Sequence, residues 1–226
     1  MSIFTIGDLH LSKNSNKPMD VFRGWADYEK KIEENWEYMV SEEDTVIVCG
    51  DITWGKNLEE AKEDFLFLDG LKGKKIILKG NHDYYFETKT KVEKFFAEND
   101  IKTISVLHNN SYIVENINIC GTRGWVDEKD IPHDTKMVNR EANRLELSIE
   151  ARDKNLETIV FLHYPPVFSK YVCEEIMAVL LKYDIKECYF GHIHGAKMKY
   201  CVNEYKGIKM HLISADNVEF TPVLVK

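Results

Sequence analysis

Short polar clusters, each directly after an apolar run, place the strongest constraint on how this chain can fold. They are Gly7-Asp8-Leu9-His10, Gly50-Asp51, Gly80-Asn81-His82-Asp83, His163 and Gly191-His192-Ile193-His194. A short apolar run of this kind is typical of a buried strand. In an open α/β sheet, side chains at the carboxyl ends of strands that are distant in sequence converge on one edge. The sequence therefore predicts that these clusters meet in one site.

The first half of the chain alternates between strand and helix signals. Buried strands are predicted at residues 2–6, 45–49 and 75–78. Between them, residues 28–40 carry apolar side chains at helical spacing, and so do residues 57–68, with Asn57 as the helix cap. Another short helix is predicted around Val92, Phe95 and Phe96. This alternation predicts βαβ units around a parallel sheet.

The middle of the chain changes character. Residues 104–107, 111–114 and 117–120 are short strand candidates separated by Asn-containing turns, which predicts antiparallel hairpins. The remaining predicted elements are a helix at 134–154, a strand at 158–162, a helix at 171–183, and strands at 186–190, 209–214 and 218–225. Because no repeat, low-complexity tract or linker interrupts the chain, we expect a single domain over residues 1–226.

Composition limits the classes of partner. The net charge of −8 argues against a surface built to neutralise a nucleic-acid backbone. No apolar run approaches the roughly 20 residues that span a bilayer, and the start of the chain lacks the basic leader and apolar stretch of a signal peptide. Cys49, Cys120 and Cys188 lie within apolar runs and are predicted to be buried free thiols. We expect a cytoplasmic protein that binds neither nucleic acid nor membrane.

The residue types in the clusters are those of a metal site. Asp8 and His10 are two positions apart, as are His192 and His194, so in extended backbone each pair would present two donors to one point. Carboxylate oxygen and imidazole nitrogen suit Mn, Fe or Zn. The predicted ligands are Asp8, His10, Asp51, Asn81, His163, His192 and His194. This set is larger than one tetrahedral ion can use. With Asp51 bridging, it fits two ions about 3.5–4 Å apart, the arrangement used for displacement at phosphorus.

Each cluster taken alone has a simpler structural explanation. Asp8 could cap a turn, Gly50-Asp51 is a common loop sequence, and His163 could be a hydrogen-bonded core histidine. Taken together, these explanations would leave many polar groups without partners beside buried strands. The joint pattern therefore favours a metal site.

The order of the motifs closely resembles that of the calcineurin-like metallophosphoesterases, and the motifs run from residue 8 to residue 194. The resemblance implies an α/β fold, a four-layer α/β/β/α sandwich of two mixed sheets, with a dinuclear metal centre at the strand ends. One ion would be held by Asp8, His10, Asp51 and His194, and the second by Asp51, Asn81, His163 and His192. A metal-bridging hydroxide would attack phosphorus. His82 would lie beside the leaving oxygen and donate a proton or a hydrogen bond.

The chain departs from one branch of that family. In the protein-phosphatase branch, the motif that begins at Gly50-Asp51 continues to a second Asp followed by Arg, and here Trp54 and Gly55 stand at those positions. The carboxylate that would orient His82 is therefore unassigned, and the departure argues against a Ser/Thr protein phosphatase. Asp83 is adjacent to His82 in sequence, but adjacency alone does not place it at the ring.

Two further residues are candidates for substrate binding. Arg123 and Trp125 follow a predicted strand, so Arg123 could bind a phosphate through two hydrogen bonds and Trp125 could stack on a base or sugar. The alternative is a surface turn with a packed Trp. The polar residues 127–136 are a candidate lid.

These observations predict a dinuclear-metal-dependent phosphoesterase, either a monoesterase or a diesterase, acting on a small or nucleotide-like phosphate ester. One alternative is a non-catalytic metal-binding scaffold on the same fold, and another is a nuclease. The complete ligand set together with His82 favours catalysis over a scaffold, and the acidic composition argues against a nuclease.

Overall fold

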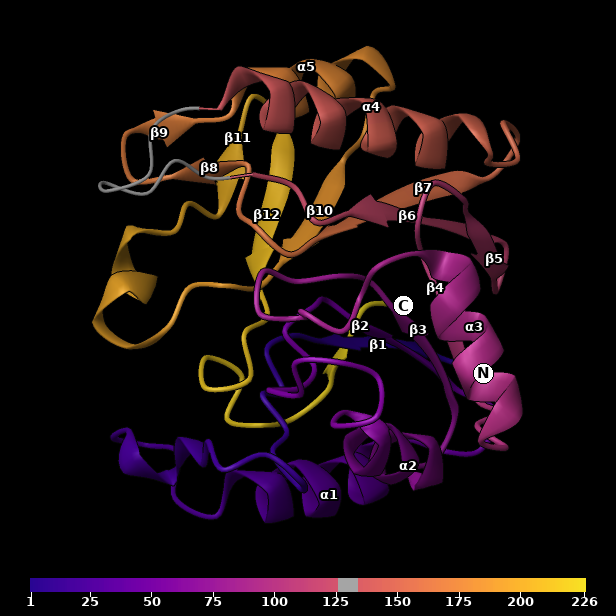
Figure 1. The fold of residues 1–226 in the computed structure, drawn as a ribbon. Coiled ribbons are helices and arrows are strands. Elements are labelled where there is room, and N and C mark those ends of the chain that lie inside the picture. The colour runs from indigo at the N-terminus through magenta and orange to yellow at the C-terminus, as the bar shows by residue number, and fades with distance from the viewer. Residues whose placement is uncertain (126–133) are drawn as a thin grey trace.

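Two β-sheets pack face to face, and helices cover the outer face of each (Figure 1). The computed structural model describes residues 1–125 and 134–226. The arrangement is a four-layer α/β/β/α sandwich of two mixed sheets, as predicted.

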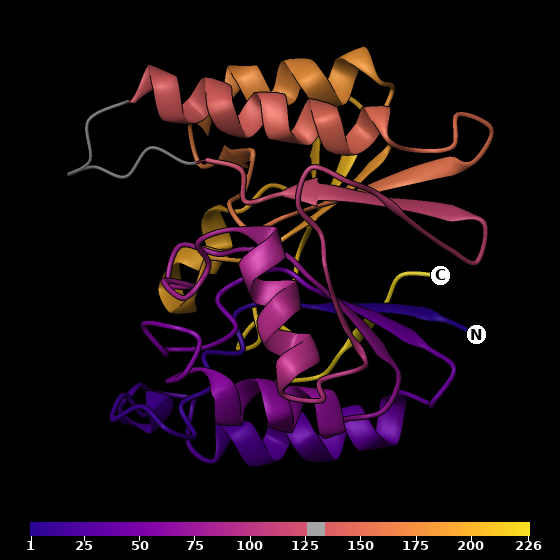
Figure 2. The ribbon, with the colours of Figure 1, turned by 45° about the vertical axis from the view of Figure 1, so that its right-hand side comes forward.

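The first sheet has the strand order β13-β1-β2-β3-β4. Its parallel strands are β1 (Ile3–Ile6), β2 (Thr45–Val48), β3 (Lys74–Ile77) and β4 (Ile104–Val106). The final strand, β13 (Val223–Leu224), pairs antiparallel with β1, so the two ends of the chain lie side by side (Figure 2).

The second sheet has the strand order β11-β12-β10-β7-β6-β5. Its four central strands are parallel: β12 (Ile208–Leu212), β10 (Glu187–Phe190), β7 (Glu157–Leu162) and β6 (Ile117–Thr122). Two antiparallel strands flank them, β11 (Glu204–Tyr205) and β5 (Tyr112–Val114). A separate hairpin is formed by β8 (Val167–Phe168) and β9 (Tyr171–Val172).

The helices form the two outer layers. The first sheet is covered by α1 (Tyr28–Met39) and α2 (Lys62–Gly70), and the second by α4 (Thr135–Glu150) and α5 (Glu174–Lys182) (Figure 1). Helix α3 (Lys89–Glu98) packs beside β4. Two short 3-10 segments, η1 (Met19–Val21) and η2 (Gly195–Tyr200), lie in loops.

Each of the three interfaces between layers has its own apolar cluster, because the central strands are buried on both faces. In β2, Val46 and Val48 pack toward the α1/α2 layer, whereas Ile47 packs between the sheets. In β7, Val160 and Leu162 pack toward α4 and α5. This two-sided burial explains why the strands read as continuous apolar runs rather than as alternating patterns.

Several predicted elements were wrong in detail. Residues 104–107 form no hairpin, because β4 joins the first sheet parallel to β3. The helix predicted at 171–183 begins only at Glu174, since Tyr171 and Val172 belong to β9. Of the strand predicted at 218–225, only Val223–Leu224 forms a strand, because residues 218–220 are turn, with left-handed backbone at Glu219 and Phe220 (φ of 52° and 59°).

The helix start predicted at Asn57 was also wrong. The Asn57 side chain accepts a hydrogen bond from the Glu60 N–H at 2.9 Å, but it caps only a turn, and α2 begins at Lys62. The prediction of buried free thiols at Cys49, Cys120 and Cys188 is confirmed. Among the described residues, none of the helices combines the length and the apolar character that crossing a bilayer requires.

Candidate metal centre

The predicted ligands lie where the carboxyl ends of strands from both sheets meet. Asp8 follows β1, Asp51 follows β2 and Asn81 follows β3, all in the first sheet. His163 follows β7, and both His192 and His194 follow β10, in the second sheet. The parallel direction of these strands is what delivers all of the side chains to one edge.

The first group of converging donors is Asp8, His10 and His194, whose ligand atoms lie within 4.8 Å of one another. Asp8 is fully buried and His10 is 3% exposed. Nε2 of His194 lies 3.6 Å from Oδ1 of Asp8. One carboxylate and two imidazoles held this close together are a set of donors that a metal ion would satisfy.

The second group is Asp51, His163 and His192, again within 4.8 Å of one another. Asp51 also connects this group to the first. Its Oδ2 atom lies 3.5 Å from Nε2 of His163 in the second group and 3.8 Å from Nε2 of His10 in the first. One carboxylate oxygen therefore faces both groups.

The hydrogen bonds of His163 test whether a cation fits. Its Nδ1 is 3.0 Å from the Cys49 carbonyl oxygen, and its Nε2 is 2.6 Å from Oδ1 of Asn81. Burial lowers the pKa of His163, so the ring is neutral and carries one proton. One proton can serve only one of these two oxygens, and with the proton on Nδ1, facing the carbonyl, the Nε2 lone pair would face the Asn81 oxygen. Two acceptors converge there, and a metal ion held by both fits that position.

Backbone geometry explains why glycine precedes several predicted ligands. A Cβ atom on Gly80 would overlap the Asp51 carboxylate, and one on Gly191 would overlap the Asp8 carboxylate. Only glycine allows the loops to approach these side chains so closely. The glycines that the sequence places beside the polar residues thus make room for ligands from other strands.

Four of the predicted ligands have left-handed backbone: φ is 57° at Asp8, 47° at His10, 50° at Asp51 and 71° at His192. Such conformations cost about 1–3 kcal/mol each and cluster at functional sites. Cross-loop hydrogen bonds hold them in place, for example from the His10 N–H to the Asp51 carbonyl at 2.9 Å.

This backbone also corrects the spacing argument. The backbone is left-handed at Asp8, His10 and His192. Asp8 and His10 still join the same group, as predicted, but His192 and His194 do not present two donors to one point, because His194 joins the first group and His192 the second. The grouping instead follows the distribution that the family resemblance implied.

Asp83 has a structural role rather than the ring-orienting one left open by the sequence. Its buried carboxylate accepts hydrogen bonds from the backbone N–H groups of Asp51 at 2.8 Å, Ile52 at 2.9 Å and Gly80 at 2.7 Å. It therefore fixes the loop that carries Asp51 to the loop that carries Asn81.

His82 lies at the edge of the centre. Its backbone N–H donates to Oδ1 of Asp51 at 2.7 Å, and its ring lies 4.5 Å from the ring of Trp54 and 5.7 Å from that of His10. Burial lowers the pKa of His82 to about 4. Within the described part of the chain its Nδ1 has no hydrogen-bond partner. The ring is thus neutral, and no carboxylate among the described residues orients its Nδ1.

In the metal-free protein, the pKa shifts of the predicted ligands determine which of them carry a charge. Burial raises the pKa of Asp8, but the charge of His194 and its hydrogen bond outweigh burial and hold that pKa well below its usual range. Burial lowers the pKa of His10 to about 3, so the ring is neutral. Burial and the nearby Asp8 charge raise the pKa of Asp51 to about 7.

The pKa of His194 shifts in the opposite direction to that of His10. Burial lowers its pKa, but the Asp8 charge and the hydrogen bond to Asp216 outweigh burial and raise the pKa to about 10. In the metal-free protein, protons on His194 and Asp51 therefore carry the positive charge that a cation would otherwise supply.

Asp216 was missed by the sequence reasoning. Its Oδ1 accepts a hydrogen bond from Nδ1 of His194 at 2.7 Å, and its Oδ2 accepts one from the Gly195 N–H at 3.1 Å. This leaves Nε2 of His194 directed toward Asp8. Carboxylates commonly fix metal-ligating histidines in this way.

A signal for Asp216 was present in the sequence, because it follows the strand predicted at 209–214, as the other site residues follow theirs. The parallel bridge between Gly7 and Ser214 places it beside the end of β1.

The predicted substrate contacts, Arg123 and Trp125, lie close to the second group. The backbone carbonyl of Arg123 accepts from the His163 N–H at 3.1 Å. The Arg123 side chain is 16% exposed, and its guanidinium lies 5.4 Å from the Trp125 ring and pairs with the buried Glu141 at 3.4 Å. Phosphate binding by Arg123 stays a prediction. The positive charge of Arg123 is already partly balanced by Glu141. The candidate lid at 127–136 lies largely outside the described residues.

Comparisons with known proteins bear on the family and the fold. The model of the calcineurin-like phosphoesterase family matches residues 1–196, a segment that includes every predicted ligand and ends before Asp216. No curated protein sequence matches this chain.

A protein of unknown function from Aquifex aeolicus, AQ665, is similar in structure, with a TM-score of 0.58, 16% identity, and coverage of 99% of this chain and 95% of that one. The protein TT1561 of Thermus thermophilus has a TM-score of 0.54, 12% identity, and coverage of 85% and 81%. At such identities the likeness shows the fold alone.

Proposed function

The chain belongs to the calcineurin-like phosphoesterase family, and on that premise we propose that it hydrolyses a small or nucleotide-like phosphate ester with the help of two metal ions. The motif order predicted this family, and the match over residues 1–196 confirms it. Membership supports a metal-dependent phosphoesterase in general. The observation that carries the two-ion proposal is the position of Asp51 Oδ2, which faces both donor groups.

The proposed division of ligands follows these two groups. Asp8, His10 and His194 would hold one ion, and Asn81, His163 and His192 the other, with Asp51 shared. The carboxylate and imidazole donors suit Mn, Fe or Zn. When bound, the ions would supply Lewis-acid activation of water and would neutralise charge on the phosphoryl oxygens.

His82 would act on the leaving oxygen. Because its pKa is lowered to about 4, the ring is neutral near pH 7 and would donate a hydrogen bond from its N–H rather than a full proton. The backbone N–H of His82 donates a hydrogen bond to Asp51, so the main chain of His82 is held beside the centre whatever its side chain does.

Hydrolysis of p-nitrophenyl phosphate and bis-p-nitrophenyl phosphate tests the function directly. Metal-stripped protein should be inactive, and adding back Mn, Fe, Zn, Ni or Mg should restore turnover with one or more of these ions. The ratio between the two substrates distinguishes a monoesterase from a diesterase. Two bound ions without turnover of either ester would contradict the proposal and favour the scaffold alternative.

Metal loading should release protons and should weaken in acid. A raised pKa keeps a group protonated to higher pH, so His194, with a pKa of about 10, and Asp51, with a pKa of about 7, both compete with metal below those values. We expect affinity to fall as the pH is lowered from about 8 to about 6. Calorimetry in buffers of different ionisation enthalpy measures the protons released. Loading without proton release would contradict these protonation states.

Asp216→Ala should weaken metal binding about 10- to 100-fold, because the hydrogen bond that fixes His194 is lost. Asp216→Asn keeps one acceptor oxygen and should lose less. Asn217→Ala is the matched control, since that neighbouring side chain donates to the Leu212 carbonyl and belongs to neither donor group. Competition with a chelator of known affinity gives the constants. Equal affinities for Asp216→Ala and wild type would show that the contact does not support the ligand.

A further inference from the structure

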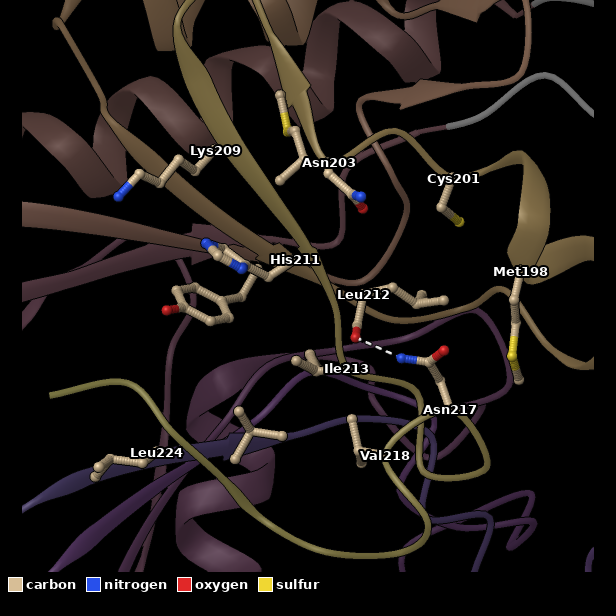
Figure 3. A pocket seen from close by; sticks show the side chains of 13 residues that line it. Met198, Cys201, Asn203, Lys209, His211, Leu212, Ile213, Asn217, Val218 and Leu224 are labelled. Atoms are coloured by element: carbon tan, nitrogen blue, oxygen red, sulfur yellow. Dashed lines mark hydrogen bonds between the residues drawn. The ribbon is translucent and has the colours of Figure 1, made fainter.

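Two cavities in the described part of the chain differ in their relation to the candidate metal centre. Figure 3 shows the larger one, of about 540 Å³, which lies between β12 and the C-terminal segment and has His211 and Leu224 among its lining residues. No predicted ligand lines it. The second, of about 420 Å³, is bordered by His10, His82 and His194 and by Phe22, Trp25 and Trp54. We call this second space the aromatic cavity.

The aromatic cavity borders the residues that are proposed to act on the substrate. His10 and His194 belong to the first donor group, and His82 is the residue proposed to contact the leaving oxygen. A phosphoryl group bound at the ions would therefore direct its ester substituent past His82 and into this cavity. Its volume is within the range of about 300–1,000 Å³ that is usual for small-molecule sites.

The walls of the cavity are aromatic. The Trp54 ring stacks on His10, with centroids 4.8 Å apart and planes at 21°. Trp25 packs edge-on against His194 at 5.6 Å and is only 3% exposed. Phe22, which also lines the cavity, is 56% exposed. Such walls favour a flat ring that can stack or pack edge to face.

The polar groups of the cavity do not suit a polyhydroxyl or peptide leaving group. Apart from the histidines, its charged lining residues are Arg23 and Asp216, and both Asp216 oxygens already accept hydrogen bonds. The remaining polar partners in the lining are Arg23 and the histidines, which are few for the many hydroxyl groups of a polyhydroxyl leaving group. Arg23 adds a positive charge, which can lie against the face of an aromatic ring.

We propose that the aromatic cavity binds a planar aromatic ring in the leaving group of the substrate, as in an arylalkyl phosphate or a nucleoside phosphate. This inference rests on the proposed phosphoesterase function and defines the substrate class of the same site. The ring would contact Phe22 and Trp54, while the ester oxygen would lie beside His82.

Binding of non-hydrolysable phosphonates tests the cavity without turnover. Benzylphosphonate and cyclohexylmethylphosphonate are similar in size and carry the same charged group, and only the first has a flat ring. Metal-loaded protein should bind benzylphosphonate about 5- to 150-fold more tightly, the range expected for aromatic stacking. Equal dissociation constants in calorimetry would overturn the proposal.

Variants locate that preference in the cavity. Phe22→Ala alters an exposed side chain and is expected to leave the fold intact, and Trp54→Leu removes the second ring wall. Each should reduce the preference for benzylphosphonate. Tyr38→Ala, at an 88% exposed aromatic on α1, is the control and should keep it. An unchanged preference in both cavity variants would also overturn the proposal.

Two pairs of esters distinguish the sources of the ring. Adenosine 5′-monophosphate and ribose 5-phosphate share the same primary ester and differ in the base, and benzyl phosphate and cyclohexylmethyl phosphate differ in the aromatic ring. A lower KM for adenosine 5′-monophosphate than for ribose 5-phosphate supports a nucleoside as the source of the ring. A lower KM for the aromatic member of the second pair alone supports a simpler arylalkyl group. Absence of turnover with every ester and metal would reject the proposed function, whereas the phosphonate measurements would still decide what the cavity binds.

Discussion

Asp51→Asn is expected to lower the metal affinity of both donor groups by more than about 100-fold. This loss of affinity is larger than the one expected when the substituted residue only supports a ligand. The reason is that Asp51 Oδ2 lies 3.8 Å from Nε2 of His10 and 3.5 Å from Nε2 of His163. An amide there removes the negative charge, and its NH₂ group cannot ligate. Turnover should fall to the rate of metal-stripped protein. Elemental analysis after gel filtration measures the ions retained.

Loss of fold would not explain that result. The amide oxygen of Asn can still accept the His82 backbone N–H, which Oδ1 of Asp51 accepts at 2.7 Å. Burial and the Asp8 charge raise the pKa of Asp51 from 3.8 to about 7, so the ionised carboxylate destabilises metal-free protein increasingly between those values. Above about pH 7, Asp51→Asn should therefore melt no lower than wild type when both are metal-free.

Asp100→Asn serves as the matched control for Asp51→Asn. It makes the same chemical change at a side chain that is 83% exposed and left-handed in backbone, with φ of 60°. It should retain both ions. If Asp51→Asn also retained both, or lost only one, the shared position of Asp51 would be refuted.

His82→Ala is expected to reduce turnover by about 100- to 10,000-fold while metal content stays near that of wild type. The ring borders the aromatic cavity beside the centre, yet it belongs to neither donor group. Its link to Asp51 runs through the backbone N–H, which the substitution keeps. Steady-state kinetics and elemental analysis on the same samples separate the catalytic effect from metal loss.

A second substitution distinguishes the two possible actions of His82. If the neutral ring donates a hydrogen bond, His82→Gln should recover part of the activity lost in His82→Ala, because its amide is also a donor. If the ring transfers a proton, the Gln variant should be as impaired as the Ala variant. Loss of an ion from His82→Ala would instead identify His82 as a ligand.

The sequence by itself determined the strands of the core and the residues gathered at their ends. Val46, Ile47 and Val48 form a continuous apolar run because both faces of their strand are buried, and such a run can be recognised without knowing its neighbours. The polar clusters after these runs could be assigned to one edge because parallel strands bring their carboxyl ends together.

Only the tertiary structure determined which donor group each residue joins and which other residues hold it in place. His192 and His194 enter different donor groups because of left-handed backbone that local spacing does not predict. Asp83 joins two loops, and Asp216 supports His194, through contacts that depend on which strand ends are neighbours. The position of β4 at the edge of the first sheet likewise depends on strand pairing. Periodicity reports which faces of an element are buried, whereas pairing between distant segments is fixed only when the sheets assemble.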